Sequence, residues 1–180
     1  VSSHGFSAAL IAAQVMAAAG IYANATTPPD ETLGLLRDSL ADELATTEMY
    51  LTTFYGVLDP TAGRLTFTNA GHPYAYRLPR FGPAERLAPT APPLGLVDES
   101  RFGRRVVPWH FTADTLVLFT DGLIDQPNAE GERFGEARII ARLEEGRQQS
   151  PAALVRAVMD DVREWGGGPT DDCTLLVLRM

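Results

Sequence analysis

The spacing of hydrophobic residues predicts two helices near the start of the chain. Residues 6–23 are rich in alanine, and the bulky apolar members of this segment are Leu10, Ile11, Val15 and Met16. After a break at Thr27-Pro28-Pro29-Asp30, leucines recur at helical spacing, at Leu33, Leu36, Leu40 and Leu44. That spacing is typical of an amphipathic helix, which we predict over 30–45. Asp30 is predicted to cap this helix at its N-terminus.

The pattern then changes to the shorter period of strands. Residues 52–58 and 64–69 flank Asp59-Pro60-Thr61-Ala62-Gly63, which is a turn-forming sequence, and are predicted to form a hairpin. Further strands are predicted at 73–78, 101–108, 115–120 and 173–178. Residues 79–95 are rich in proline and are predicted to be mostly loop.

Two more helices are predicted at 135–145 and 151–165. The second has one apolar face, formed by Leu154, Val155, Val158, Met159, Val162 and Trp165. Helices and strands therefore do not alternate as they do in a parallel α/β protein, and their order predicts an α+β fold built on antiparallel sheet. With 180 residues, the chain is long enough for one domain with its own core.

The composition of the chain limits which kinds of partner and which cellular compartment we expect. The formal net charge is −8 and no block of Lys and Arg occurs, so nucleic acid and anionic membranes are poor candidate partners. Cys173 is the only cysteine, which rules out an internal disulfide framework and fits a reducing compartment. The apolar run Ala8–Ala19 is too short to span a bilayer, and no secretory signal is visible. We therefore expect a cytoplasmic protein with no membrane segment in this chain.

Acidic residues stand at the ends of two predicted strands. Asp121 follows the strand 115–120, and Asp171-Asp172 precede the strand 173–178. If these strands are antiparallel neighbours, the carboxylates lie at one edge of a sheet and need a counter-cation. Mg²⁺ and Mn²⁺ prefer such oxygen ligands, and Gly122 would let the backbone turn sharply away from the ion. The alternative is a solvated Asp-Gly turn beside a solvated strand start, and spacing alone leaves both open.

No other chemistry has a motif in this chain. The spacing of Cys and His residues does not match a zinc site, and the G-x-S-x-G, G-x-G-x-x-G and P-loop motifs are absent. Each of the three histidines, His4, His72 and His110, is by itself more typical of a structural residue than of a catalytic one.

Five motifs in order carry a resemblance to a known family. They are FYGVLDPTAGRLTFTNAGHPYAYRL (54–78), PPLGL (92–96), LVLFTDGLID (116–125), ERFGEARI (132–139) and TDDCTLLVLR (170–179). The opening VSSHGFSAAL is similar to a D-V-S-G-H-G-x-x-A-A-L segment. Together these motifs resemble the SpoIIE-type (RsbU-like) phosphatases, which belong to the PPM (type 2C) superfamily of metal-dependent protein serine/threonine phosphatases.

The resemblance implies a fold and a metal site. The fold is two packed antiparallel β-sheets flanked by helices, with a two-metal site for Mn²⁺ or Mg²⁺ at one edge. Asp121 matches the metal-binding aspartate of the T-D-G motif, and Asp171 matches the first acid of the D-D-x-T motif. Asp172 is implied to be an auxiliary ligand or a support for the ligands.

Two further correspondences fall at the start of the chain. Val1 matches the residue whose backbone carbonyl faces a metal, and His4 with Gly5 matches the H-G that closes the opening motif. His4 is therefore the candidate catalytic residue. The implied reaction is hydrolysis of phosphoserine or phosphothreonine esters by a water whose pKa the metals lower. The usual substrates in this family are phosphorylated STAS-type anti-sigma-factor antagonist proteins of bacterial partner-switching pathways.

The chain also departs from the family pattern. The acidic G-D-x-x-D motif of an early strand is absent, no aspartate precedes Val1, and Ser3 stands where the motif has glycine. We therefore expect a single phosphatase domain over residues 1–180 that lacks its first strands and belongs to a larger protein with an upstream sensor domain. The isolated chain is expected to hydrolyse p-nitrophenyl phosphate poorly or not at all. The alternative is a catalytically impaired pseudophosphatase or regulatory binding module.

Overall fold

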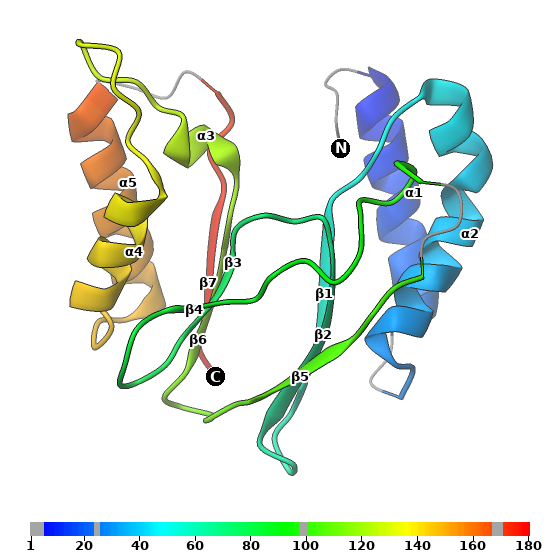
Figure 1. The fold of residues 1–180 in the computed structure, drawn as a ribbon, viewed down its shortest axis with the longest axis horizontal. Coiled ribbons are helices and arrows are strands. Elements are labelled where there is room, and N and C mark those ends of the chain that lie inside the picture. The colour runs from blue at the N-terminus through cyan, green and yellow to red at the C-terminus, as the bar shows by residue number, and fades with distance from the viewer. Residues whose placement is uncertain (1–5, 24–25, 98–100, 167–170) are drawn as a thin grey trace. The chain divides into compact units, whose positions relative to one another are not determined.

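A computed structural model of the protein describes residues 6–23, 26–97, 101–166 and 171–180 (Figure 1). The chain divides into two compact units, each of which is described by itself. The first unit is Val1–Pro73 with Ala88–Trp109, and the second is Tyr74–Leu87 with His110–Met180.

The first unit contains two helices and a three-stranded antiparallel sheet. Its elements are α1 (Phe6–Tyr22), α2 (Pro29–Thr47), β1 (Thr53–Asp59), β2 (Arg64–Ala70) and β5 (Arg105–Pro108). The strand order is β1-β2-β5, and the predicted hairpin is present, with Thr53 opposite Ala70 and Asp59 opposite Arg64. Gly63 closes its turn at φ +59°, a backbone conformation that favours glycine.

The predicted leucine stripe of α2 forms the core of this unit. Leu33, Leu36, Leu40 and Leu44 are all buried, and they pack with Ile11 of α1 and with Leu51, Ala70 and Leu94. The bulky residues of α1 do not share one side, because Ile11 is buried whereas Leu10 and Met16 are exposed.

The predicted cap at Asp30 is wrong. Helix α2 begins one residue earlier, at Pro29, and Pro28 in the capping position makes no side-chain capping bond. A proline at the first helical position has a suitable φ and needs no N–H partner, so the helix can begin there. Asp30 instead lies in the first turn, where a negative charge suits the helix dipole, and its carboxylate lies 3.4 Å from the guanidinium of Arg104.

The second unit contains a four-stranded antiparallel sheet and three helices. Its elements are β3 (Ala75–Leu78), β4 (Glu85–Arg86), β6 (Thr115–Phe119), α3 (Asp121–Ile124), α4 (Glu136–Glu145), α5 (Pro151–Gly166) and β7 (Leu175–Leu178). The strand order is β4-β3-β6-β7. Helices α4 and α5 lie side by side along one face of this sheet (Figure 1).

Apolar residues of both helices and the central strands form the core of this unit. They include Val117 and Phe119 of β6, Ile139 and Leu143 of α4, and Leu154, Val158 and Val162 of α5. The predicted face of α5 therefore packs on the sheet, and short α3 is the helix that the sequence pattern did not predict. Within the described ranges, no helix combines the length and apolar character needed to cross a bilayer.

The α+β class, with two antiparallel sheets and flanking helices, is confirmed by these elements. Most of the strands are shorter than predicted; for example, residues 101–104 precede β5 without joining it. The single-domain expectation stays a prediction.

Candidate metal centre

Strands β6 and β7 bring the two predicted acidic segments to one edge of the second unit's sheet. They pair antiparallel, with Phe119 opposite Leu175. One residue further, the Thr120 N–H donates to the carbonyl of Thr174 at 3.1 Å, and the Thr174 N–H donates to the Thr120 hydroxyl at 2.9 Å. Asp121 leaves this edge as Asp171 and Asp172 approach it, so the predicted strand pairing is confirmed.

Thr120 connects the two segments through its side chain. Its hydroxyl donates to the Asp172 carbonyl at 3.3 Å and accepts the Thr174 N–H. Thr120 is also the residue before α3, yet its hydroxyl makes no capping bond to that helix, because it bonds across to β7 instead. The sequence pattern did not predict this role of Thr120. The feature that could have indicated it is that both the T-D-G and the D-D-x-T motifs contain a threonine, and these two threonines lie opposite each other.

The carboxylates themselves are solvent-exposed. Asp121 is the first residue of α3, and its backbone carbonyl accepts the Asp125 N–H at 2.8 Å. The Asp171 carboxylate accepts the N–H of Asp172 through Oδ1 at 2.7 Å, in the segment that leads into β7. Asp172 contributes its backbone carbonyl to the contact with Thr120, which suits a supporting role.

Gly122 is needed for close approach, which differs from the predicted sharp turn. It lies in α3, and a Cβ on it would lie 2.5 Å from the carbonyl oxygen and 3.0 Å from the carbonyl carbon of Asp172. Contacts that short are repulsive. Only glycine at position 122 therefore lets α3 lie against the backbone of Asp172.

We predict that Gly122→Ala destabilises the protein, although alanine is the better helix former. The clash with Asp172 is expected to outweigh the propensity gain and to cost about 1–3 kcal/mol. Gly34→Ala is the matched control, because Gly34 lies inside α2 and a Cβ there meets no atom within 4 Å. That variant should gain up to about 1 kcal/mol. Urea unfolding followed by circular dichroism measures both, and a gain for both would contradict the role given to Gly122.

The electrostatic field at this edge is negative. The Tyr74 ring stacks on Phe119 with centroids 5.1 Å apart. Burial raises the pKa of the Tyr74 phenol, and the charges of Glu136, Asp125 and Asp121 raise it further. Burial likewise raises the pKa of the Cys173 thiol, with added contributions from the charges of Asp171 and Asp172. Such a field favours a bound cation.

The donor chemistry of this edge fits Mg²⁺ or Mn²⁺, because the side chains offered are carboxylates. In the part of the chain that the structure describes, no three His, Cys, Asp or Glu side chains converge to hold a metal. The assignment of Asp121 and Asp171 as metal ligands stays a prediction. Val1 and His4, the other predicted site residues, lie outside the described residues.

The other two histidines take part in turns. The His72 N–H donates to the Asn69 carboxamide oxygen and the His72 carbonyl accepts from the same side chain, both at 2.8 Å. The His110 N–H donates to the Asp114 carboxylate at 2.9 Å. These backbone contacts agree with the prediction that both histidines have a structural role.

Comparison with known proteins identifies the family. The family model described as Stage II sporulation protein E (SpoIIE) matches residues 1–180. The chain belongs to the SpoIIE family. Among curated relatives, Protein IcfG of Synechocystis sp. is 32% identical over 112 residues, which is 61% of this chain and 17% of that protein. The match therefore spans less than a fifth of that relative's length.

Solved structures share the fold of this SpoIIE-family chain. The SiaA-PP2C domain of Pseudomonas aeruginosa matches with a TM-score of 0.84 and 23% identity, covering 99% of this chain and 72% of that one. The RsbU and RsbW domains of Rv1364c from Mycobacterium tuberculosis match with a TM-score of 0.80 and 25% identity, covering 99% and 49%. The resemblance and the type 2C phosphatase fold are thus confirmed. The chain is homologous to protein phosphatase domains.

Proposed function

We propose that this SpoIIE-family chain is the phosphatase domain of a bacterial signalling protein and hydrolyses phosphoserine or phosphothreonine in a protein substrate, with Mn²⁺ or Mg²⁺ as cofactor. The observation that carries the proposal is the β6–β7 register, which places Asp121 and Asp171 at one edge of the sheet. The structure of RsbX in complex with magnesium, which matches with a TM-score of 0.68, supports the choice of metal.

Each residue of the edge has a distinct part in this proposal. Asp121 and Asp171 supply carboxylate oxygens to the metal, and Asp172 supports them through its backbone. Thr120 and Gly122 keep the two segments in contact, through a hydrogen bond and through close packing. Bound divalent ions would lower the pKa of a water and neutralise phosphate charge. Val1, through its backbone carbonyl, and His4 also belong to the proposed site.

The proposed substrate is a phosphorylated STAS-type anti-sigma-factor antagonist, and the proposed setting is a cytoplasmic partner-switching pathway. The support is the similarity to a chain in which an RsbU domain occurs together with an RsbW domain. The net charge of −8 makes nucleic acid an unsuitable partner, and a lone cysteine suits the cytoplasm.

Metal dependence tests the proposal. The gene product that carries this chain should release phosphate from a phosphoserine protein in Mn²⁺ buffer, stop after chelation with EDTA, and recover when Mn²⁺ is restored. A phosphotyrosine peptide of matched sequence serves as the comparison substrate. Stoichiometric binding of the phosphoprotein without any release would contradict the proposal and identify a regulatory binding module instead.

A further inference from the structure

The segment between α3 and α4 is a short hairpin, which we call the 126–134 hairpin. Pro127 and Arg133 form its bridge, and the Phe134 N–H donates to the Gln126 carbonyl at 2.9 Å. Asn128 closes the turn: its side-chain oxygen accepts the N–H groups of Glu130 and Glu132 at 3.1 and 2.8 Å. This hairpin directly follows the helix that begins at Asp121.

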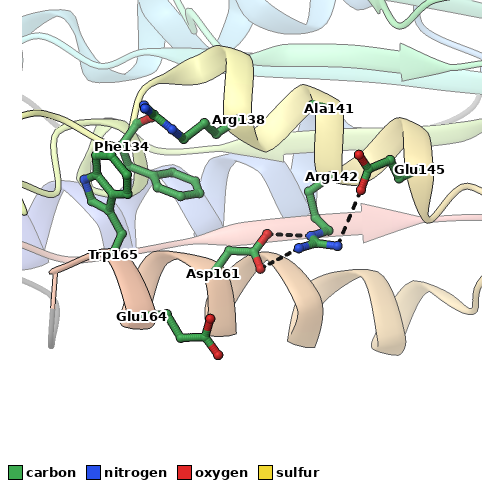
Figure 2. Close-up of a pocket in the computed structure, with 8 residues that line it drawn as sticks. All are labelled: Phe134, Arg138, Ala141, Arg142, Glu145, Asp161, Glu164 and Trp165. Carbon is green, nitrogen blue, oxygen red and sulfur yellow. Dashed lines mark hydrogen bonds and ion pairs between the residues drawn. The ribbon is translucent and has the colours of Figure 1, made fainter.

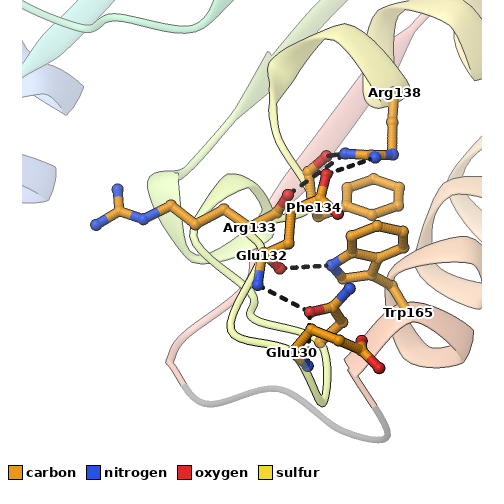
Figure 3. Close-up of polar contacts among 7 residues, drawn as sticks. Glu130, Glu132, Arg133, Phe134, Arg138 and Trp165 are labelled. Atoms are coloured by element: carbon orange, nitrogen blue, oxygen red, sulfur yellow. Dashed lines mark hydrogen bonds and ion pairs between the residues drawn. The ribbon is translucent and has the colours of Figure 1, made fainter.

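Three side chains from two helices and the hairpin itself hold it in place (Figure 3). We call Phe134, Arg138 and Trp165 the Trp165 cluster. The indole N–H of Trp165 donates to the Glu132 carbonyl at 3.0 Å. The Arg138 guanidinium lies 4.1 Å from the centroid of the indole ring, and the Phe134 ring meets the indole edge-on. Arg138 also donates to the Phe134 carbonyl at 2.7 Å and to the Glu132 carboxylate at 2.9 Å.

The end of α5 lies directly against the base of the same hairpin. A Cβ on Gly166 would lie 2.2 Å from the side-chain Nε2 of Gln126 and 2.7 Å from the Pro127 carbonyl oxygen. The residues that follow Gly166 in sequence lead to Asp171. The cluster and Gly166 therefore join the hairpin that follows α3 to the end of α5.

Holding α4 to α5 does not require the Trp165 cluster. One turn further along α4, Arg142 makes a two-bond ion pair with Asp161 of α5, with nitrogen–oxygen distances of 2.5 and 2.8 Å (Figure 2). The Trp165 cluster lies at the hairpin end of the same pocket between the two helices. The bonds that it adds go to the hairpin, to the backbone carbonyls of Glu132 and Phe134 and to the Glu132 carboxylate.

From this geometry we infer that Trp165 and Arg138 are positioning residues of the metal centre. They hold the hairpin that follows Asp121 and α3 against the end of α5, so less conformational freedom remains to be lost when Asp121 binds a cation. The inference rests on the proposed function, because it assigns these residues a role toward the same cation. By linkage, metal binding must in turn stabilise the hairpin against opening.

The test is Mn²⁺ affinity, measured by titration of the gene product with electron paramagnetic resonance detection of free Mn²⁺. Trp165→Ala and Arg138→Gln are expected to weaken binding about tenfold, the lower end of the effect of removing a group that orients metal ligands. Trp165→Phe keeps the ring and loses the indole N–H, so a smaller loss is expected. Hydrogen exchange of the hairpin amides should slow on Mg²⁺ addition in the wild type and less so in these variants.

Two controls separate positioning from stability. Arg142→Gln removes the neighbouring arginine of α4 and its ion pair with Asp161, and Val158→Ala opens the buried core of α5. Both should lower the unfolding midpoint and leave Mn²⁺ affinity within twofold of wild type. Unchanged affinity in Trp165→Phe, Arg138→Gln and Trp165→Ala would overturn the inference while leaving the metal site intact. Unchanged affinity in Asp121→Asn would overturn the proposed function as well.

Discussion

Replacing Asp121 by asparagine in the gene product that carries this chain is expected to abolish most Mn²⁺-dependent phosphatase turnover. Asparagine keeps the size of the side chain and removes the charge that we propose binds the cation. Supporting groups around metal ligands typically contribute 10- to 100-fold, so loss of a direct ligand should cost at least about 100-fold in activity. Phosphate release from a phosphoserine protein at saturating substrate measures the effect.

The same substitution should not lower the stability of the metal-free protein. Asp121 is exposed, and its charge adds to burial and to the charges of Glu136 and Asp125 in raising the pKa of Tyr74. Removing one of these like charges relieves repulsion. Asp160→Asn is the matched control, because Asp160 is an exposed carboxylate on α5 that forms a surface ion pair with Arg163. Turnover by Asp121→Asn at more than half the wild-type rate would contradict the role of Asp121 as a ligand.

The largest expected effect on stability comes from replacing Asp114, which has no part in the proposed metal site. Its carboxylate is buried and lies 2.7–2.8 Å from the guanidinium of Arg77, which is also buried. The same carboxylate accepts the His110 N–H. Among the described residues, Asp114→Asn leaves the buried Arg77 with the partly exposed Glu85 as its charged partner. Breaking a buried ion pair from one side costs about 3–5 kcal/mol, and we expect about 3 because Glu85 remains.

Urea unfolding of the metal-free protein measures the loss. Arg163→Gln, which breaks the exposed ion pair on α5, is the control and should cost at most about 1 kcal/mol. Equal losses for the two variants would show that burial does not set the strength of the Arg77–Asp114 pair.

The spacing of apolar residues predicted the helices that have one buried face. The leucines of α2 and the apolar face of α5 are spaced at the helical period, and both helices lie where that spacing predicts them. Boundaries were less predictable where local chemistry competes. Pro29 begins α2 before Asp30 can cap it, and Thr120 uses its hydroxyl across the sheet instead of on α3.

The candidate site was predictable only where acidic side chains stand near the end of a predicted strand. Asp121 and Asp171 each adjoin an apolar strand, so pairing of β6 with β7 was enough to bring them to one edge. The reason for Gly122 was not predictable, because the carbonyl it approaches is distant in sequence. Trp165 was assigned to an apolar helix face, and its bond to the Glu132 carbonyl depends on the fold of a hairpin that periodicity does not reveal.

We propose that Asp121 and Asp171 bind the same divalent cation, and Mn²⁺ titration of the wild type, Asp121→Asn, Asp171→Asn and the double variant tests this proposal. Each single substitution is expected to weaken Mn²⁺ binding strongly. The double variant should be little worse than either, since the effects of residues that act on one ion are not additive. Wild-type Mn²⁺ affinity in either single variant would contradict it.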